Sequence, residues 1–271
     1  MTSKLIPKSP AEVMVTRQVV PNVITTFSAP FWRFGRIRIG GRGTIVRLRS
    51  GALAVFSPVA LSDEVKETVA KLGEVKYITA LDIEHHIFLG PWHAAYPQAK
   101  VLGPEGLPEK RAKQKNEDVP FSVIFTAKDR DSTTVDAEFD SEFEYTYLPS
   151  HPNKELVFNH KPTKTLIEAD LMFNLPATEQ FSKTGESATS GFWTRLFTIF
   201  NNTNGAATGQ RRFLWYAISS GDRKGFNSSV AKIDKWDFDR IIPCHGDVIE
   251  TGGRGIFQKV MAWHLATKKA V

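Results

Sequence analysis

Apolar positions along the chain alternate in some segments and recur at helical spacing in others, which predicts a mixed α/β protein. The first clear signal is a β-hairpin, in which apolar runs at 44–48 and 53–56 flank the turn pair Ser50-Gly51. Next, residues 62–72 start with a serine and two acids and repeat apolar positions at helical spacing, as a capped helix does. Another apolar run follows and completes a β–β–α–β unit.

The rest of the chain shows more strand signals than helix signals. Strands are expected at 75–79, 100–102, 121–125, 143–148, 155–160, 164–168 and 239–242, and helices at 87–95, 226–235 and 255–268. Residues 177–211 differ, because they are rich in Ser, Thr, Gly and Asn around one aromatic cluster at 192–200. We interpret them as an inserted loop with a short amphipathic helix, which either closes over a site as a lid or packs on the domain edge.

Length and composition place the chain among ordinary globular proteins. Its 271 residues are 41% hydrophobic and 24% charged, which is enough apolar content to bury a core. We expect one domain over residues 1–271, with a flexible N-terminal arm at 1–20. No apolar run is long enough for a secretory signal or a membrane span, and the single Cys244 suits a reducing compartment. We therefore expect a cytoplasmic protein.

The charge of the chain is mildly basic, with a net value of +6. The densest basic run, 110–115, is either a solvated helix end or a contact for an anionic partner. There is no nucleic-acid-binding motif, no phosphate-binding P-loop and no Gly-x-Ser-x-Gly elbow. A small-molecule substrate is therefore expected, and the oligomeric state is left open.

Candidate chemistry lies directly after four of the apolar runs. His85, His151, Asp170 and His245 each follow such a run, where strand ends present side chains to a shared crevice. Imidazoles combined with a carboxylate suit a borderline divalent metal. Structural interpretations are also open: the first histidine could start a helix, the second could end a strand, and the aspartate could cap a turn. Cys244 is expected to be a small buried residue.

The order and spacing of these residues resemble the metallo-β-lactamase fold family. The resemblance rests on Asp82-Ile83-Glu84-His85-His86, Pro149-Ser150-His151-Pro152, Leu166-Ile167-Glu168-Ala169-Asp170 and Pro243-Cys244-His245-Gly246. That family carries a His-x-His-x-Asp-His motif, a lone His, a bridging Asp and a late Pro-x-His-Gly, in this order. The resemblance covers about residues 43–267 and is closest to an uncharacterised branch. It implies a four-layer αββα sandwich of two mixed β-sheets flanked by helices, with metal at one sheet edge.

The first of these motifs departs from the family pattern. In one register, Ala80 and Asp82 stand where the first two histidines belong, and Glu84 replaces the family's Asp. In the other register, Asp82, Glu84 and His86 are the three alternating positions. Either way an imidazole has been replaced by a carboxylate, which shifts the metal preference from zinc towards iron or manganese.

The resemblance implies a metal-dependent hydrolase of an ester, lactone or thioester that uses a metal-activated water. It implies the metal ligands His85, His86, His151, Asp170 and His245, and the catalytic residues Asp82, Glu84 and Asp170. Zinc is the first expectation, with iron or manganese as alternatives. A one-metal site without His86 needs the fewest assumptions, and Asp82 or Glu84 would then bind a second ion or accept the water's proton. Two other functions stay open, namely a non-catalytic binding or regulatory protein on a decayed site, and an iron-based oxidoreductase.

Overall fold

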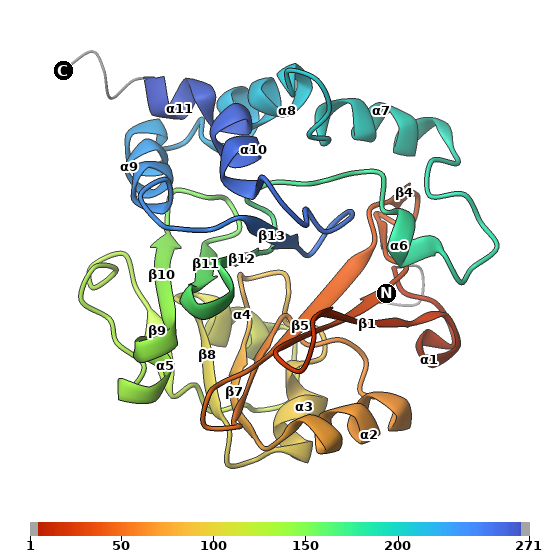
Figure 1. Cartoon of the computed structure of the whole chain (residues 1–271), viewed down its shortest axis with the longest axis vertical. Helices are drawn as coiled ribbons and strands as arrows, with labels where there is room; N and C mark the ends of the chain where they lie inside the picture. The colour runs from red at the N-terminus through yellow and green to blue at the C-terminus, as the bar shows by residue number, and fades with distance from the viewer. Residues whose placement is uncertain (1–4, 267–271) are drawn as a thin grey trace.

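The computed structural model describes residues 5–266, which form two β-sheets that face each other (Figure 1). Within these residues the larger sheet has the strand order β1-β2-β5-β6-β7-β8-β9, and the smaller sheet has the order β10-β11-β12-β13. Both sheets mix parallel and antiparallel neighbours. The strands of the larger sheet are β1 (Val15–Val20), β2 (Ile24–Ala29), β5 (Gly41–Arg47), β6 (Leu53–Phe56), β7 (Val75–Thr79), β8 (Lys100–Pro104) and β9 (Val123–Phe125). Those of the smaller sheet are β10 (Phe143–Leu148), β11 (Glu155–His160), β12 (Thr165–Glu168) and β13 (Arg240–Pro243).

Helices cover the outer faces of both sheets, and a short hairpin of β3 (Trp32–Arg33) and β4 (Ile37–Arg38) stands beside them. The helices of the first half are α1 (Pro10–Val13), α2 (Asp63–Leu72), α3 (Leu89–Ala95), α4 (Leu107–Lys113) and α5 (Ala137–Glu142). Those of the second half are α6 (Thr178–Phe181), α7 (Phe192–Phe200), α8 (Thr208–Phe213), α9 (Arg223–Ile233), α10 (Gly253–Val260) and α11 (Ala262–Ala266). A π-helical turn, Leu214–Ile218, continues α8.

Alternation along the strands builds the layers, because successive side chains point to opposite faces of a sheet. In β6, Leu53 and Val55 pack with α2 and α3, whereas Ala54 and Phe56 belong to the core between the sheets. There the Phe56 ring lies 5.0 Å from that of Phe158 in β11. The outer face of the smaller sheet packs on α9 and α10 through a third cluster. The predicted αββα sandwich is therefore confirmed (Figure 1).

Most of the predicted elements are confirmed, since their signals are local. The hairpin is β5–β6, and α2 begins after Ser62, whose Oγ accepts the N–H of Val65 at 3.3 Å. The closing helix differs, because it breaks at Met261 into α10 and α11, and its predicted last residues lie outside the described part of the chain. The break leaves both Met261 and His264 buried.

The N-terminal segment and the loop at 177–211 contain more structure than expected. Residues 15–20, expected in a flexible arm, form β1 and pair antiparallel with β2, whereas residues 1–4 of that arm lie outside the described residues. The domain expected over 1–271 likewise has its last five residues, 267–271, outside them. The predicted helix of the loop is α7, and α6 and α8 flank it. Among the described helices, none has both the length and the apolar character that crossing a bilayer requires.

Candidate metal centre

Three candidate residues come together where strands of both sheets end. His85 follows β7 by six residues, Asp170 lies two residues after β12, and His245 lies two residues after β13. Because β12 and β13 are parallel neighbours, with Glu168 opposite Pro243, their carboxyl ends deliver both side chains to one place. The ligand atoms of the three residues all lie within 4.8 Å of one another.

His85 is held by the carboxylate of Asp82, which is fully buried. Asp82 Oδ1 accepts the backbone N–H groups of Glu84 and His85, each at 2.7 Å, and lies 2.9 Å from His85 Nδ1. A carboxylate can only accept here, so Nδ1 carries a proton, and in the neutral ring Nε2 presents a lone pair. Asp82 therefore orients this imidazole and fixes its tautomer.

His245 is held by a backbone carbonyl and by a parallel aromatic ring. Its Nδ1 lies 2.6 Å from the carbonyl oxygen of Gly40, so that nitrogen is the donor and Nε2 again presents a lone pair. The ring of Phe173 stacks on it at 5.1 Å with an interplanar angle of 9°. The next residue, Gly246, has φ +90°, and a Cβ there would lie 2.2 Å from the carbonyl oxygen of Asn174. Glycine is needed for this turn, and the turn sets the direction of His245.

Asp170 is positioned by two buried residues. The carboxylate of Glu155 accepts the backbone N–H groups of Ala169 and Asp170, at 2.7 and 2.9 Å. Asn153 donates its amide to Asp170 Oδ2 at 2.5 Å, which leaves Oδ1 to face His245 Nε2 at 3.2 Å. Asp170 Oδ1 is buried and accepts no hydrogen bond among the described residues.

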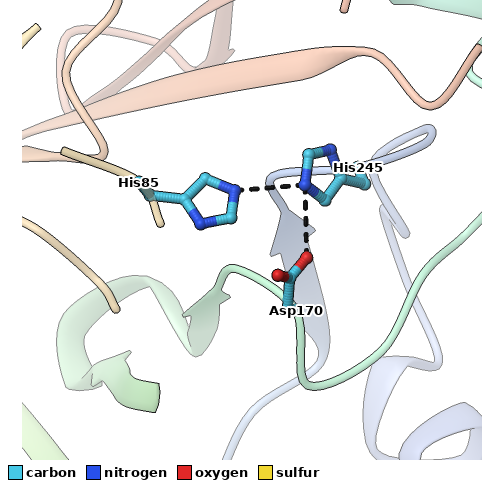
Figure 2. Close-up of side chains that lie close together, drawn as sticks. All are labelled: His85, Asp170 and His245. Carbon is cyan, nitrogen blue, oxygen red and sulfur yellow. Dashed lines mark hydrogen bonds and ion pairs between the residues drawn. The ribbon is translucent and has the colours of Figure 1, made fainter. Parts of the chain in front are cut away.

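The three free atoms converge, and this arrangement fits a metal ion. His85 Nε2 and His245 Nε2 face each other at 3.1 Å, with Asp170 Oδ1 beside them (Figure 2). Two lone pairs and a carboxylate oxygen at this spacing repel one another unless a proton or a cation lies between them. Two imidazoles whose outer nitrogens are held by a carboxylate and a carbonyl, together with one carboxylate, form a typical donor set for a divalent transition metal.

The charges around the cluster favour a cation. Burial lowers the pKa of His85, but the Asp82 carboxylate, with Asp170 behind it, outweighs burial and raises the pKa to about 10. For His245, burial is the largest cause and the pKa is lowered despite the contact with Asp170. Burial acts to raise the pKa of Asp170, but His245 and the positive charge on His85 hold it below its usual range. Without a metal, this field places a second proton on His85, at the Nε2 that faces His245 Nε2. The same field favours a divalent ion, which would displace that proton and bind the lone pair.

Two of the predicted ligands are not among the residues whose ligand atoms converge. The ring of His151 is buried and stacks near Phe226 at 6.4 Å, and its Nδ1 accepts the N–H of Asn153 at 3.2 Å. Burial is the main cause that lowers the pKa of His151, although Asp170 and Asp82 act to raise it. His86 lies beside Arg111, whose guanidinium contacts Nδ1 at 3.3 Å, and burial together with nearby cations lowers its pKa to about 4.

The two carboxylates predicted to act on water have different surroundings. Glu84 lines a cavity of about 700 Å³ that ends at the cluster, and its carboxylate is paired with Lys110 at 2.6 Å. Asp82 does not line this cavity, since its Oδ1 receives three N–H groups beneath His85. The wall of the cavity is largely apolar and includes Met14, Pro30, Phe31, Phe34, Ile87 and Phe88, with Arg33 as a cation.

Three residues that position the candidate ligands were not predicted from the sequence. Asn153 reaches the cavity from the turn that was expected to supply His151, and Gly40 acts only through its carbonyl. Glu155 is the first residue of β11, and burial raises its pKa, with Glu168 as the next cause. The available signal for this residue was a glutamate directly before the apolar run at 156–158.

Comparison with solved structures identifies the class of fold. The DIM-1 metallo-β-lactamase is 13% identical, with 97% of this chain and 99% of that chain covered and a TM-score of 0.55. A metallo-β-lactamase from Pontibacter korlensis is 11% identical, with coverages of 93% and 98% and a TM-score of 0.55. The Flv1 flavodiiron core from Synechocystis sp. PCC6803 is 14% identical, with coverages of 94% and 62% and a TM-score of 0.60. The chain therefore has the metallo-β-lactamase fold, which hydrolases and flavodiiron oxidoreductases share.

Comparison with family models identifies the branch. Residues 33–183, more than half of the chain, match the family described as Domain of unknown function (DUF4336), and the chain belongs to that family. A comparison with curated proteins gave no significant match. The matched range contains His85 and Asp170, whereas His245 follows it.

Proposed function

We propose that the protein is a metal-dependent hydrolase whose metal ligands are His85, Asp170 and His245. The observation that carries the proposal is the convergence of two imidazole lone pairs and one carboxylate oxygen at the end of a cavity. A divalent metal bound there would lower the pKa of a bound water to about 7 and polarise a carbonyl oxygen. Three protein ligands leave a position open, as catalytic zinc sites do.

Other residues would position the metal ligands and accept a proton from the bound water. Asp82 and the Gly40 carbonyl would hold the imidazoles, and Asn153 would keep Asp170 Oδ1 turned towards them. We assign the proton acceptor to Glu84, because it faces the cavity, and we assign positioning to Asp82. Glu84→Gln should lower kcat at least tenfold and leave metal content unchanged. Loss of metal from this variant would instead make Glu84 a ligand.

The cavity favours substrates with an apolar body. Phe31, Phe34 and Phe88 line it, and Arg33 is available for a carboxylate or a similar anionic group. Among the three substrate classes proposed, namely esters, lactones and thioesters, we expect those with an acyl or aryl portion to react best, since burial of apolar area strengthens binding.

Metal content tests the proposal directly. Protein purified without chelators is analysed by elemental mass spectrometry beside His245→Gln and the control His93→Gln, which changes a histidine on α3 outside the cavity lining. We expect close to one equivalent of metal in the wild type and the control, and almost none in His245→Gln. A wild type that stays empty after incubation with zinc, iron and manganese would refute the hydrolase and favour a non-catalytic role.

The donor set also favours a second candidate, an iron-based oxidoreductase. Two histidines and one carboxylate with open positions are the ligands of many non-haem iron enzymes, and one similar fold belongs to a flavodiiron core. Iron as the main metal, with dioxygen consumption in the presence of a reductant and no ester hydrolysis, would favour this candidate. Zinc or manganese with hydrolysis would favour the first.

A further inference from the structure

Helix α7 presents its apolar side to solvent. Five large apolar side chains of this helix are exposed: Phe192, Trp193, Leu196, Ile199 and Phe200. Their spacing of one, three and four residues places them on one stripe of the helix. Exposure is high, at 71% for Phe192 and 60% for Ile199. A helix that only packs on a domain buries such a stripe. Helix α7 lies at the edge of the molecule (Figure 1), and these five side chains are exposed.

Specific polar contacts hold α7 in this orientation. Thr194 is buried, and its Oγ1 accepts the backbone N–H of Arg38 at 3.1 Å. The guanidinium of Arg38 also donates to the carbonyl of Ser190 just before the helix, at 2.6 Å. On the inner side, Phe197 packs edge-on against Phe173 at 5.8 Å. The inward side of α7 is therefore a defined docking face, and the apolar stripe is left for another partner.

The charges next to the stripe along the sequence are mainly positive, and the nearest acid, Glu186, is paired with Arg38. Residues 187–221 contain no Asp or Glu but contain Arg195, Arg211 and Arg212. Arg195 lies one turn before Ile199 and borders the stripe, and both Arg195 and Arg212 are exposed. Exposed Trp, Phe and Leu beside arginines are typical of a helix that lies in the interface of a membrane with anionic lipids.

We propose that α7 docks on an anionic lipid bilayer, with its apolar stripe in the headgroup region. A second copy of the chain fits this face less well. In a two-fold symmetric dimer the patch meets itself, which would bring Arg195 and Arg212 of both copies together without an acid from 187–221 to pair with them. Anionic headgroups would pair with the same arginines. The proposal does not depend on the chemistry of the metal centre.

Vesicle flotation of the full chain tests the proposal. Wild-type protein is mixed with vesicles of phosphatidylcholine alone, or of phosphatidylcholine with phosphatidylserine. Three variants are compared with it: Trp193→Ser/Ile199→Ser, Arg195→Glu/Arg212→Glu, and Ile124→Ser as a control. Ile124 is 42% exposed on β9, outside 187–221, so its variant removes a similar apolar surface elsewhere.

We expect the wild type and the Ile124→Ser control to float with the vesicles that contain phosphatidylserine. Both double variants should bind at least tenfold more weakly, because one loses apolar burial and the other loses the charge attraction. All the replaced side chains are exposed or half-buried, so thermal melts should match the wild type. Absence of wild-type flotation, or equal binding to both kinds of vesicle, would overturn the proposal. So would a wild-type dimer in light scattering that Trp193→Ser/Ile199→Ser dissociates.

Discussion

Replacing Asp82 with Asn tests whether this buried carboxylate prepares His85 for metal. The wild-type Oδ1 accepts two backbone N–H groups at 2.7 Å and approaches His85 Nδ1 at 2.9 Å. An amide oxygen can accept the same hydrogen bonds, so the loop should keep its shape. The negative charge that makes the imidazole a stronger ligand is lost.

The expected effect of Asp82→Asn is a 10- to 100-fold weaker metal affinity, which corresponds to about 1.4–2.7 kcal/mol. This range is typical for partners that hydrogen-bond to a ligating histidine, and the three donors on one oxygen place Asp82 in that class. The measurement is a zinc dissociation constant, obtained by competition with a chromophoric chelator for the wild type and the variant.

Asp136→Asn is the matched control. Asp136 also accepts a backbone N–H, that of Phe139 at 3.0 Å, but caps α5 and pairs with Lys100 instead of serving a histidine. The Asp136→Asn variant should have a lower free energy of unfolding but the same metal affinity as the wild type. If Asp82→Asn bound zinc as tightly as the wild type, or if both variants lost affinity equally, the positioning role of Asp82 would be refuted.

Three further predictions concern the turn, the acid response and the ligand count. Gly246→Ala should lower the free energy of unfolding by about 2–4 kcal/mol, because its Cβ would lie 2.2 Å from a backbone carbonyl oxygen. The control Gly205→Ala, where φ is +51° and a Cβ has open space, should lower it by about 1 kcal/mol. Equal losses of the two variants in urea titrations would contradict this. Burial and a nearby arginine lower the pKa of His264 to about 4. In the unfolded chain the pKa of this histidine is about 6.5, so on acidification the unfolded chain binds the proton before the folded chain does. The free energy of unfolding therefore has its full value above pH 6.5 and is about 2 kcal/mol lower at pH 5. His264→Asn should flatten this decline, and an unchanged slope in denaturation series from pH 7 to pH 5 would count against it. His151→Gln should keep most of the metal that His245→Gln loses, and equal loss in elemental analysis would make His151 a fourth ligand.

Local signals explain why much of the fold could be predicted. The Ser50-Gly51 turn joins β5 to β6, and Ser62 and Gly73 bound α2. In each case the residues that specify the element lie within the element or next to it. Contacts with distant residues then stabilise the same secondary structure that the local sequence favours. The αββα arrangement was implied by the resemblance to the metallo-β-lactamase fold family, and the two facing sheets confirm it.

The strand β2 was not predicted, because polar residues interrupt its apolar pattern. Thr25, Thr26 and Ser28 stand among apolar residues in β2, yet all three are buried. Ser28 donates to Glu179, which lies 151 residues away. Such a strand resembles a solvated segment until its partner is known. The inserted helix α7 shows the converse case, because its periodicity reveals an apolar side but not whether that side faces the core or the solvent.

The candidate metal centre, too, could be predicted from the sequence only in part. Strand ends followed by histidine or aspartate were enough to select His85, Asp170 and His245, because the sheets bring such ends together. Whether a histidine is a metal ligand or a structural residue depends on the hydrogen-bond partner of its outer ring nitrogen. That partner can come from a distant part of the sequence. Gly40 lies 205 residues from His245 and acts through a carbonyl that any residue type carries. Residue type therefore selects candidate ligands, but only the fold determines which of their nitrogen and oxygen atoms converge, and His151 is not among the three residues whose ligand atoms do so.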